Sequence, residues 1–159
     1  MALLEINNVD ISYGKRLIVK NSNIILEKGE ICSIVGESGS GKTTVIRAVL
    51  GLLAGGGKVT AGDIIYDGRS LLTLNDMEWR NLRGHDISMI FQDSGAMMNQ
   101  TRLIGNSYVE YIRTHEKVSK KEAWTKGAEM LSRMRLPDPD RIMHSYPFQL
   151  SGGPRQRVG

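Results

Sequence analysis

Few residues of this chain suit disulfide or metal chemistry, and no segment suits a membrane. The 159 residues include one cysteine, Cys32, and three histidines that stand far apart. One cysteine can form neither an internal disulfide nor a metal cluster, and histidines without nearby partners argue against a metal site. No apolar run approaches the roughly 18 residues of a membrane span, and the first residues lack the basic-then-apolar pattern of a signal peptide. We therefore expect a soluble protein that stays in the cytoplasm.

The charge of the chain is mildly basic and dispersed. There are 21 basic and 17 acidic residues, for a net charge of +4, with mild clusters only at Lys117–Lys121 and Arg133–Arg135. Such a distribution is typical of solvated faces, so we expect no nucleic-acid partner. With 40% hydrophobic and 24% charged residues, the composition predicts a folded α/β protein with a real core.

One stretch matches a phosphate-binding pattern at every fixed position. It reads G-E-S-G-S-G-K-T-T and fits G-x-x-x-x-G-K-[ST]. Its glycines let successive backbone N–H groups approach a phosphate, where a Cβ would block them. Lys42 would reach the β- and γ-phosphates of a nucleoside triphosphate, and the Thr43 hydroxyl would bind Mg²⁺. The predicted nucleotide-binding residues of this stretch are Gly36, Glu37, Ser38, Gly39, Ser40, Gly41, Lys42, Thr43 and Thr44.

The segments around this stretch predict a strand, a loop and a helix in that order. Ile31–Val35 is a short apolar run typical of a buried parallel strand, and we expect Cys32 to be buried within it. After the loop, apolar residues repeat at helical spacing from Lys42 to about Leu53. A flexible Gly/Ser linker is the alternative interpretation, but linkers do not join a strand to an amphipathic helix.

Two extended segments precede the loop. Leu3–Ser12 and Ile18–Leu26 are joined by a glycine-centred turn at Tyr13–Arg16, which predicts a small antiparallel sheet. An exposed aromatic ring near a nucleotide loop can stack on a base. Tyr13 is therefore either a stacking residue or ordinary surface packing, and the sequence leaves both open.

After the first helix, strands and helices are predicted to alternate. We expect a flexible glycine-rich connector at residues 55–62, a strand at Asp63–Gly68 and a helix at Asn75–Leu82. Asp86–Phe91 predicts a second apolar strand that ends at Gln92. Strands of an open α/β sheet expose their ligand-binding ends there, so Gln92 is either a metal or water ligand or an ordinary loop glutamine.

From Thr101 onward the pattern predicts a helical subdomain. Ser119 and Glu122 form a capping box ahead of an apolar stripe at helical spacing. Asp138–His144 predicts a short helix that begins with proline, and Tyr146–Phe148 an extended segment. The stripe, which we expect to form the core of this subdomain, consists of Ala123, Trp124, Ala128, Met130, Leu131 and Met134.

A second motif lies at residues 150–157. It reads L-S-G-G-P-R-Q-R and resembles the L-S-G-G-x-R-Q-R signature of ABC-transporter ATP-binding subunits. The chain also resembles that family at Tyr13, in the phosphate-binding stretch and at Gln92, so the resemblance covers essentially all 159 residues. Three segments are most similar to the peptide and nickel importer branch: Gly51–Leu53 with the glycines that follow, Met89–Asp93, and Tyr146–Gly153.

The resemblance implies a fold and a function. The fold would be that of an α/β P-loop NTPase whose mixed sheet has an antiparallel N-terminal part. The β part and the P-loop core would occupy residues 1–95, a helical subdomain residues 96–150 and the signature residues 150–157. Such a subunit couples ATP binding and hydrolysis to the import of peptides or nickel through a membrane permease. It would sit peripherally on the cytoplasmic face of the inner membrane, with a second ATP-binding subunit, permease subunits and, indirectly, a solute-binding protein as partners.

The resemblance also implies roles for single residues. Lys42 and Gln92 would serve catalysis, and Thr43 and Gln92 would bind Mg²⁺. Tyr13 would stack on adenine. Two subunits would sandwich two ATP molecules, with the signature of one covering the nucleotide held by the other. The signature residues that would contact ATP in this way are Ser151, Gly152 and Gly153.

Two departures from the family pattern carry expectations of their own. Pro154 stands where relatives carry Gln or Met, and it removes one backbone N–H near the γ-phosphate. In the family, an apolar strand that ends in Asp-Glu follows the signature. That strand does not follow here, so we expect the fold to be incomplete at its C-terminal side and expect no hydrolysis by this chain alone. Two alternatives stay open: a non-hydrolysing nucleotide-binding fragment, and an ABC-type ATPase with a role outside transport.

Overall fold

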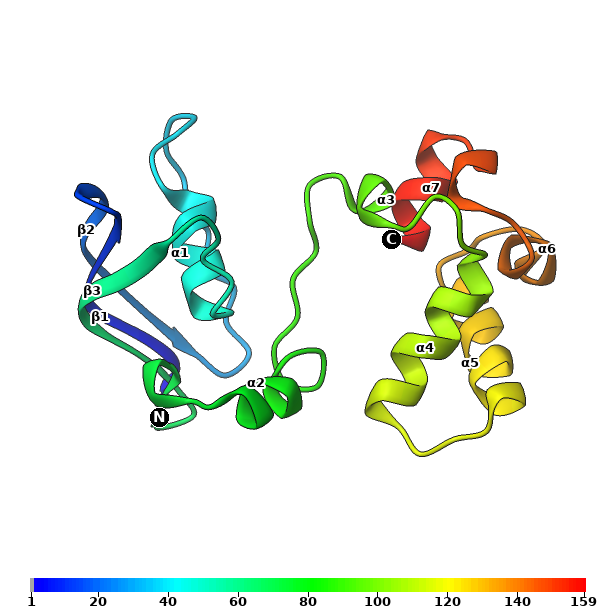
Figure 1. Cartoon of the computed structure of the whole chain (residues 1–159), viewed down its shortest axis with the longest axis horizontal. Coiled ribbons are helices and arrows are strands. Elements are labelled where there is room, and N and C mark those ends of the chain that lie inside the picture. The colour runs from blue at the N-terminus through cyan, green and yellow to red at the C-terminus, as the bar shows by residue number, and fades with distance from the viewer. Residues whose placement is uncertain (1) are drawn as a thin grey trace. The chain divides into compact units, whose positions relative to one another are not determined.

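The computed structural model describes residues 2–159, which form two compact units divided between Ser88 and Met89 (Figure 1). Each unit has its own cluster of buried apolar side chains. The division lies seven residues before the predicted boundary at residue 95, so Gln92 belongs to the second unit. None of the helices in residues 2–159 has the length and apolar character to cross a membrane.

A four-stranded antiparallel sheet forms one side of the first unit. The strands are β1 (Ala2–Tyr13), β2 (Arg16–Glu27), β3 (Gly57–Tyr66) and β4 (Arg69–Ser70), in the order β2-β1-β3-β4. The predicted N-terminal antiparallel sheet is thus confirmed. The core beneath it joins the sheet to α1 (Lys42–Val49) and η1 (Leu71–Thr73). Its buried members are Ile6, Val9, Ile11, Val19, Val45, Ala48, Val49, Ile64 and Leu71.

The glycine-rich connector predicted at residues 55–62 is wrong for most of its length, because β3 already begins at Gly57. Gly62 shows why the glycine pattern misled. Its φ is +77°, and a Cβ there would lie 2.3 Å from the carbonyl oxygen of Asn7 on β1. The register of the two strands shifts between Asn7 and Asp10. The glycine therefore marks a bulge within a strand, where two backbones approach closely.

Two predicted strands are wrong. Ile31–Val35 and Asp86–Phe91 form no strand, and the side chains of Ile31 and Ile90 are 95% and 88% exposed. Cys32 is exposed as well, which corrects its predicted burial. A buried parallel strand must pair its N–H and C=O groups with neighbouring strands. Neither run joins the sheet of residues 2–159, and the second makes only an isolated bridge, between Ile87 and Arg83. Apolar composition alone cannot supply that pairing.

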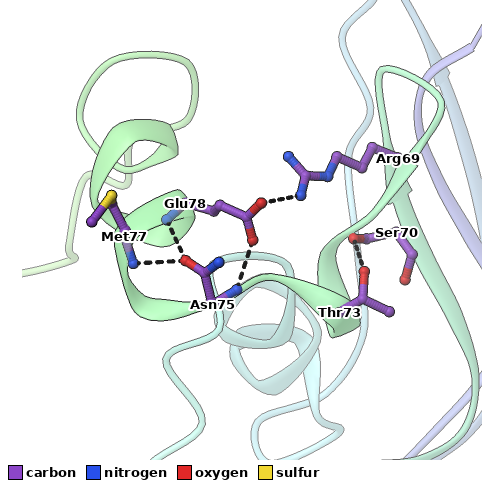
Figure 2. A network of polar contacts seen from close by, with 6 residues as sticks. All are labelled: Arg69, Ser70, Thr73, Asn75, Met77 and Glu78. Carbon is purple, nitrogen blue, oxygen red and sulfur yellow. Dashed lines mark hydrogen bonds and ion pairs between the residues drawn. The ribbon is translucent and has the colours of Figure 1, made fainter.

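The helices of the first unit begin close to where the sequence predicts. α1 starts at Lys42, but it ends at Val49 rather than near Leu53 because Gly51 turns into the left-handed region with φ +62°. α2 (Asp76–Leu82) begins after Asn75, whose side-chain oxygen accepts from the N–H groups of Met77 and Glu78 (Figure 2). The predicted helix at Asn75–Leu82 is confirmed.

The second unit is helical, as predicted. It contains α3 (Ser94–Met97), α4 (Ile104–His115), α5 (Lys120–Arg133), α6 (Pro139–Met143), η2 (Pro147–Gln149) and α7 (Gly152–Val158). Its capping box at Ser119 and Glu122 and its cap at Asp138 are confirmed. The buried members of its core are Ile104, Leu131, Leu136, Ile142, Met143 and Val158.

Two details of the helical prediction are wrong. Met130 and Met134 are 49% and 48% exposed, so these two residues of the predicted stripe lie outside the buried core. Tyr146–Phe148 is not extended, because Pro147 begins the 3-10 turn η2. Proline suits the first position of a helical turn, and the side-chain oxygen of Gln149 closes this one by accepting from the Tyr146 N–H at 2.8 Å.

Candidate nucleotide-binding site

The phosphate-binding stretch lies in the first unit, directly ahead of α1. Gly41 is the residue before the helix, with φ +91°. A Cβ at Gly41 would lie 2.9 Å from a methyl carbon of Val19 on β2. Only glycine combines this backbone conformation with this contact, so Gly41 fixes the loop against the sheet.

The loop curls around the side chain of Lys42. Its Nζ donates to the carbonyl oxygens of Gly36 at 2.8 Å and Glu37 at 2.6 Å, and lies 3.4 Å from the hydroxyl of Ser40. A Cβ at Gly36 would lie only 2.9 Å from the hydroxyl oxygen of Ser40. The first glycine of the pattern therefore allows the loop to close tightly around the Lys42 ammonium group. The arrangement holds the positively charged ammonium group of Lys42 at the N-terminus of α1.

The N-terminus of α1 is left open to an anion. No side chain caps it, and the first helical backbone bond runs from the Val45 N–H to the Gly41 carbonyl. Among the described residues, the N–H groups of Lys42, Thr43 and Thr44 have no backbone acceptor. Free N–H groups and the positive end of the helix dipole favour an anion there. With the exposed Thr43 hydroxyl as an oxygen ligand for a cation, the loop fits the phosphates of a nucleotide with Mg²⁺.

Tyr13 ends β1 in the same unit. Its ring is half-buried over Gly57, whose Cβ would lie 2.7 Å from two ring carbons. Tyr13 pairs with Arg16, which is three residues along β2 from the Val19 contact with the loop. At about 3.3 Å per strand residue, the ring therefore stands roughly 10 Å along the sheet from that contact. The ring packs against Gly57, and its role toward a base stays a prediction.

The signature residues lie in the second unit, at the start of α7. Ser151 precedes the helix and its hydroxyl caps no backbone group. Gly152 and Gly153 are exposed, with no atom within 4 Å of an added Cβ. Pro154 stands in the first turn, where a helix makes no use of its N–H groups, so α7 forms normally around it. The hydroxyl and the two glycine N–H groups are accessible to a ligand from outside this unit.

Gln92 is exposed in a turn ahead of α3. Two residues further, the buried hydroxyl of Ser94 donates to the Gln156 carbonyl of α7 at 3.0 Å. Gly95 faces α7 so closely that a Cβ would lie 2.7 Å from Arg155 Cγ. The segment after Gln92 is therefore packed directly on the signature helix. Sequence reasoning missed this contact, for which two consecutive small residues after Asp93 were the available signal.

Other bonds hold the far end of α7. The Tyr108 hydroxyl of α4 donates to the Val158 carbonyl at 2.9 Å, and the Arg157 guanidinium donates to the Met134 carbonyl at 3.2 Å. Burial raises the pKa of the Tyr108 hydroxyl, which keeps it protonated as a donor. Three elements thus fix the signature helix within its unit: α3, α4 and the end of α5.

Comparison with known proteins decides the family. The family model described as ABC transporter matches residues 19–159, which include both motifs. This chain belongs to the ABC transporter family. Both motifs therefore lie within one family region, as the sequence resemblance implied.

Curated relatives of this ABC transporter chain carry names of peptide-transport proteins. The dipeptide transport ATP-binding protein DppD of Bacillus subtilis is 40% identical over 161 residues, covering 98% of this chain and 48% of the relative. DppD of Lactococcus lactis subsp. cremoris is 37% identical, covering 98% and 46%. The oligopeptide transport ATP-binding protein OppD of Salmonella typhimurium is 38% identical, covering 98% and 48%. The chain spans about half the length of these relatives.

Solved structures support the same fold. The dimeric structure of MJ0796, a bacterial ABC transporter cassette, superposes on this ABC transporter chain with a TM-score of 0.80 at 28% identity. The match covers 98% of this chain and 66% of the cassette. A dimeric post-hydrolysis state of MJ0796 bound to ADP and Pi gives a TM-score of 0.78, also at 28% identity and with the same coverage. The expected family and the expected mixed α/β fold are confirmed.

Proposed function

We propose that this chain is the ATP-binding part of an importer for dipeptides or oligopeptides. The observation that carries the proposal is the open N-terminus of α1, where the loop holds the ammonium of Lys42 beside free backbone N–H groups. The relatives named as peptide-transport proteins support the choice of cargo. Hydrolysis of ATP with Mg²⁺ would supply the energy for transport.

The residue roles are part of the same proposal. Lys42 and the loop N–H groups bind the triphosphate, Thr43 provides a hydroxyl to Mg²⁺, and Tyr13 stacks on adenine. Gln92 joins Lys42 in catalysis and helps bind Mg²⁺ and the attacking water. In a dimer, the exposed Ser151 hydroxyl and the Gly152 and Gly153 N–H groups donate to ATP bound by the partner subunit, because donors at this position suit γ-phosphate oxygens.

The partners and location belong to the same proposal. A second ATP-binding subunit completes the nucleotide sandwich, which the dimeric cassette structures support. Permease subunits carry the cargo across the inner membrane, with this chain on their cytoplasmic face, and a solute-binding protein acts through them. Closure of the dimer by ATP would shift the permease between two states according to its affinity for each.

Mg·ATP binding tests the central part of the proposal. We expect Lys42→Ala to weaken Mg·ATP binding about 10- to 150-fold, because a hydrogen bond to a charged group contributes about 1.5–3 kcal/mol. Lys121→Ala removes the same charge from an exposed position on α5 and should leave the affinity unchanged. Isothermal titration calorimetry measures both. Equal affinities of wild type and Lys42→Ala, or no binding by the folded wild type, would contradict the proposal.

The cargo needs a separate experiment. The full-length protein, assembled with its permease and solute-binding subunits in vesicles, should take up labelled dipeptide in an ATP-dependent manner, and Lys42→Ala should abolish uptake. Uptake of Ni²⁺ without uptake of peptide would support the proposed importer function but contradict peptide as its cargo. ATP binding without measurable hydrolysis in the assembled complex would favour the non-hydrolysing alternative.

A further inference from the structure

The C-terminal end of α1 is closed partly by its own backbone. The Leu52 N–H donates to the Arg47 carbonyl at 2.8 Å, and the Gly51 N–H donates to the Ala48 carbonyl at 3.0 Å. With Gly51 in the left-handed region, these bonds form a Schellman motif. The motif leaves the carbonyls of Leu50 and Gly51 outside the helix, at the negative end of its dipole.

Arg83, from the end of α2, binds these two carbonyls. Its Nε donates to the Leu50 carbonyl at 2.8 Å and its Nη2 donates to the Gly51 carbonyl at 3.1 Å. The guanidinium also lies over the ring of Trp79, 4.4 Å from the ring centroid. A Cβ at Gly51 would approach Trp79 Cζ2 to 2.7 Å and Arg83 Nη2 to 2.8 Å, so the contact leaves no free space.

The element that presents Arg83 is itself anchored at its other end. Figure 2 shows Glu78 of α2 accepting from the backbone N–H of Asn75, at 2.8 Å, and from the guanidinium of Arg69. These two donors, the Asn75 N–H first, lower the pKa of the Glu78 carboxyl, so it stays ionised as their acceptor. α2 is therefore held at its N-terminus while Arg83 extends from its C-terminus to α1.

We infer that Arg83 is a positioning residue for the phosphate loop, an inference that rests on the proposed ATP-binding function. α1 has 8 residues and is about 12 Å long, with Lys42 and Thr43 at one end and the Arg83 contact at the other. A tilt of about 10° at the Arg83 end would displace Lys42 by about 2 Å. Displacements of about 1 Å can already impair a site strongly.

The test uses the full-length protein and four variants. Arg83→Met keeps an unbranched apolar stem and removes the donors, whereas Arg83→Lys keeps the charge but offers one donor group in place of the fork. Arg80→Met makes the same change at an exposed arginine of the same helix. Ile64→Val loosens the core of the first unit and keeps the donors and acceptors of the Arg83 hydrogen bonds. Calorimetry measures the Kd of Mg·ATP, and circular dichroism measures the Tm of each variant.

We expect Arg83→Met to raise the Kd of Mg·ATP about tenfold, Arg83→Lys to give an intermediate value, and Arg80→Met to leave it unchanged. Ile64→Val should lower the Tm without a matching change in Kd. The inference would be overturned if Arg83→Met left the Kd unchanged, or if Ile64→Val raised the Kd as much as Arg83→Met does for the same loss of Tm. Either result would leave the proposed function intact. Absence of binding in the folded wild type would instead refute the proposed function and the inference with it.

Discussion

Ser94→Ala tests whether the segment after Gln92 holds the signature helix in place. The substitution removes the donor of the 3.0 Å bond to the Gln156 carbonyl on α7. A typical hydrogen bond contributes about 0.5–1.5 kcal/mol, and an acceptor left buried and unpaired costs more. Gln156 is exposed, so its carbonyl can bond to water in the variant, and we expect a cost within this range, about 1 kcal/mol.

Hydrogen exchange of the α7 amides is the suitable assay, because it reports local opening within a folded protein. A loss of about 1 kcal/mol should speed exchange of these amides about fivefold. Gly95→Ala should act more strongly, because its Cβ would lie 2.7 Å from Arg155 Cγ and overpacking typically costs about 1–3 kcal/mol. Ser132→Ala, at an exposed position of α5, is the control.

The reasoning would be refuted if α7 amides exchanged at the wild-type rate in both Ser94→Ala and Gly95→Ala. It would also be refuted if exchange rose equally throughout the second unit, since that pattern indicates global loss of stability. A fivefold effect confined to α3 and α7 would establish that the two elements open together.

Three further predictions concern the second unit. The hydrogen bonds from Ser119 lower the pKa of the Glu122 carboxyl below its ordinary value of 4.5. Their contribution to stability is therefore complete above pH 4.5 and is lost as the pH falls through the lowered pKa. Denaturant midpoints measured across these pH values test this dependence. Tyr108→Phe leaves the buried Val158 carbonyl without its donor and should lower the free energy of unfolding by about 1–3 kcal/mol in urea titrations. Gly105→Ala places a Cβ 2.4 Å from the Trp124 ring and should lower the Tm, at a cost of about 1–3 kcal/mol.

Each of these predictions has a control within the chain. Glu122→Gln should flatten the acid dependence of stability, and an unchanged curve would contradict the first. Tyr111→Phe removes a hydroxyl from a more exposed tyrosine on the same helix and should cost less than Tyr108→Phe. Gly152→Ala, where nothing lies within 4 Å of the new Cβ, should leave the Tm unchanged; a loss equal to that of Gly105→Ala would refute the packing argument.

Local chemistry made much of this structure predictable from sequence. The capping boxes at Asn75 and Ser119 fix helix starts through bonds that span three residues, and the phosphate loop is encoded by closely spaced glycines and Lys42. Such signals need no distant partner.

The features that the sequence did not predict depend on contacts between residues that are distant in the chain. Ile31–Val35 has the apolar composition of a strand, but strand formation depends on which segments lie beside it, and the local pattern contains no information on that. The Arg83 contact with Leu50 and the Ser94 contact with Gln156 join residues 33 and 62 positions apart. Neither motif spacing nor periodicity links such pairs, so the restraints on α1 and α7 emerge only from the fold.

The exposed apolar runs have a consequence for handling the protein. Ile31 and Val35 are 95% and 89% exposed and Ile90 is 88% exposed, each within a short segment that has no regular secondary structure and no proline. Exposed apolar segments of this kind favour intermolecular β-pairing and aggregation. We expect concentration-dependent association of this chain, reduced by Ile31→Lys or Ile90→Lys. Light scattering during purification would detect it, and co-expression with the partner subunits is the first remedy to try.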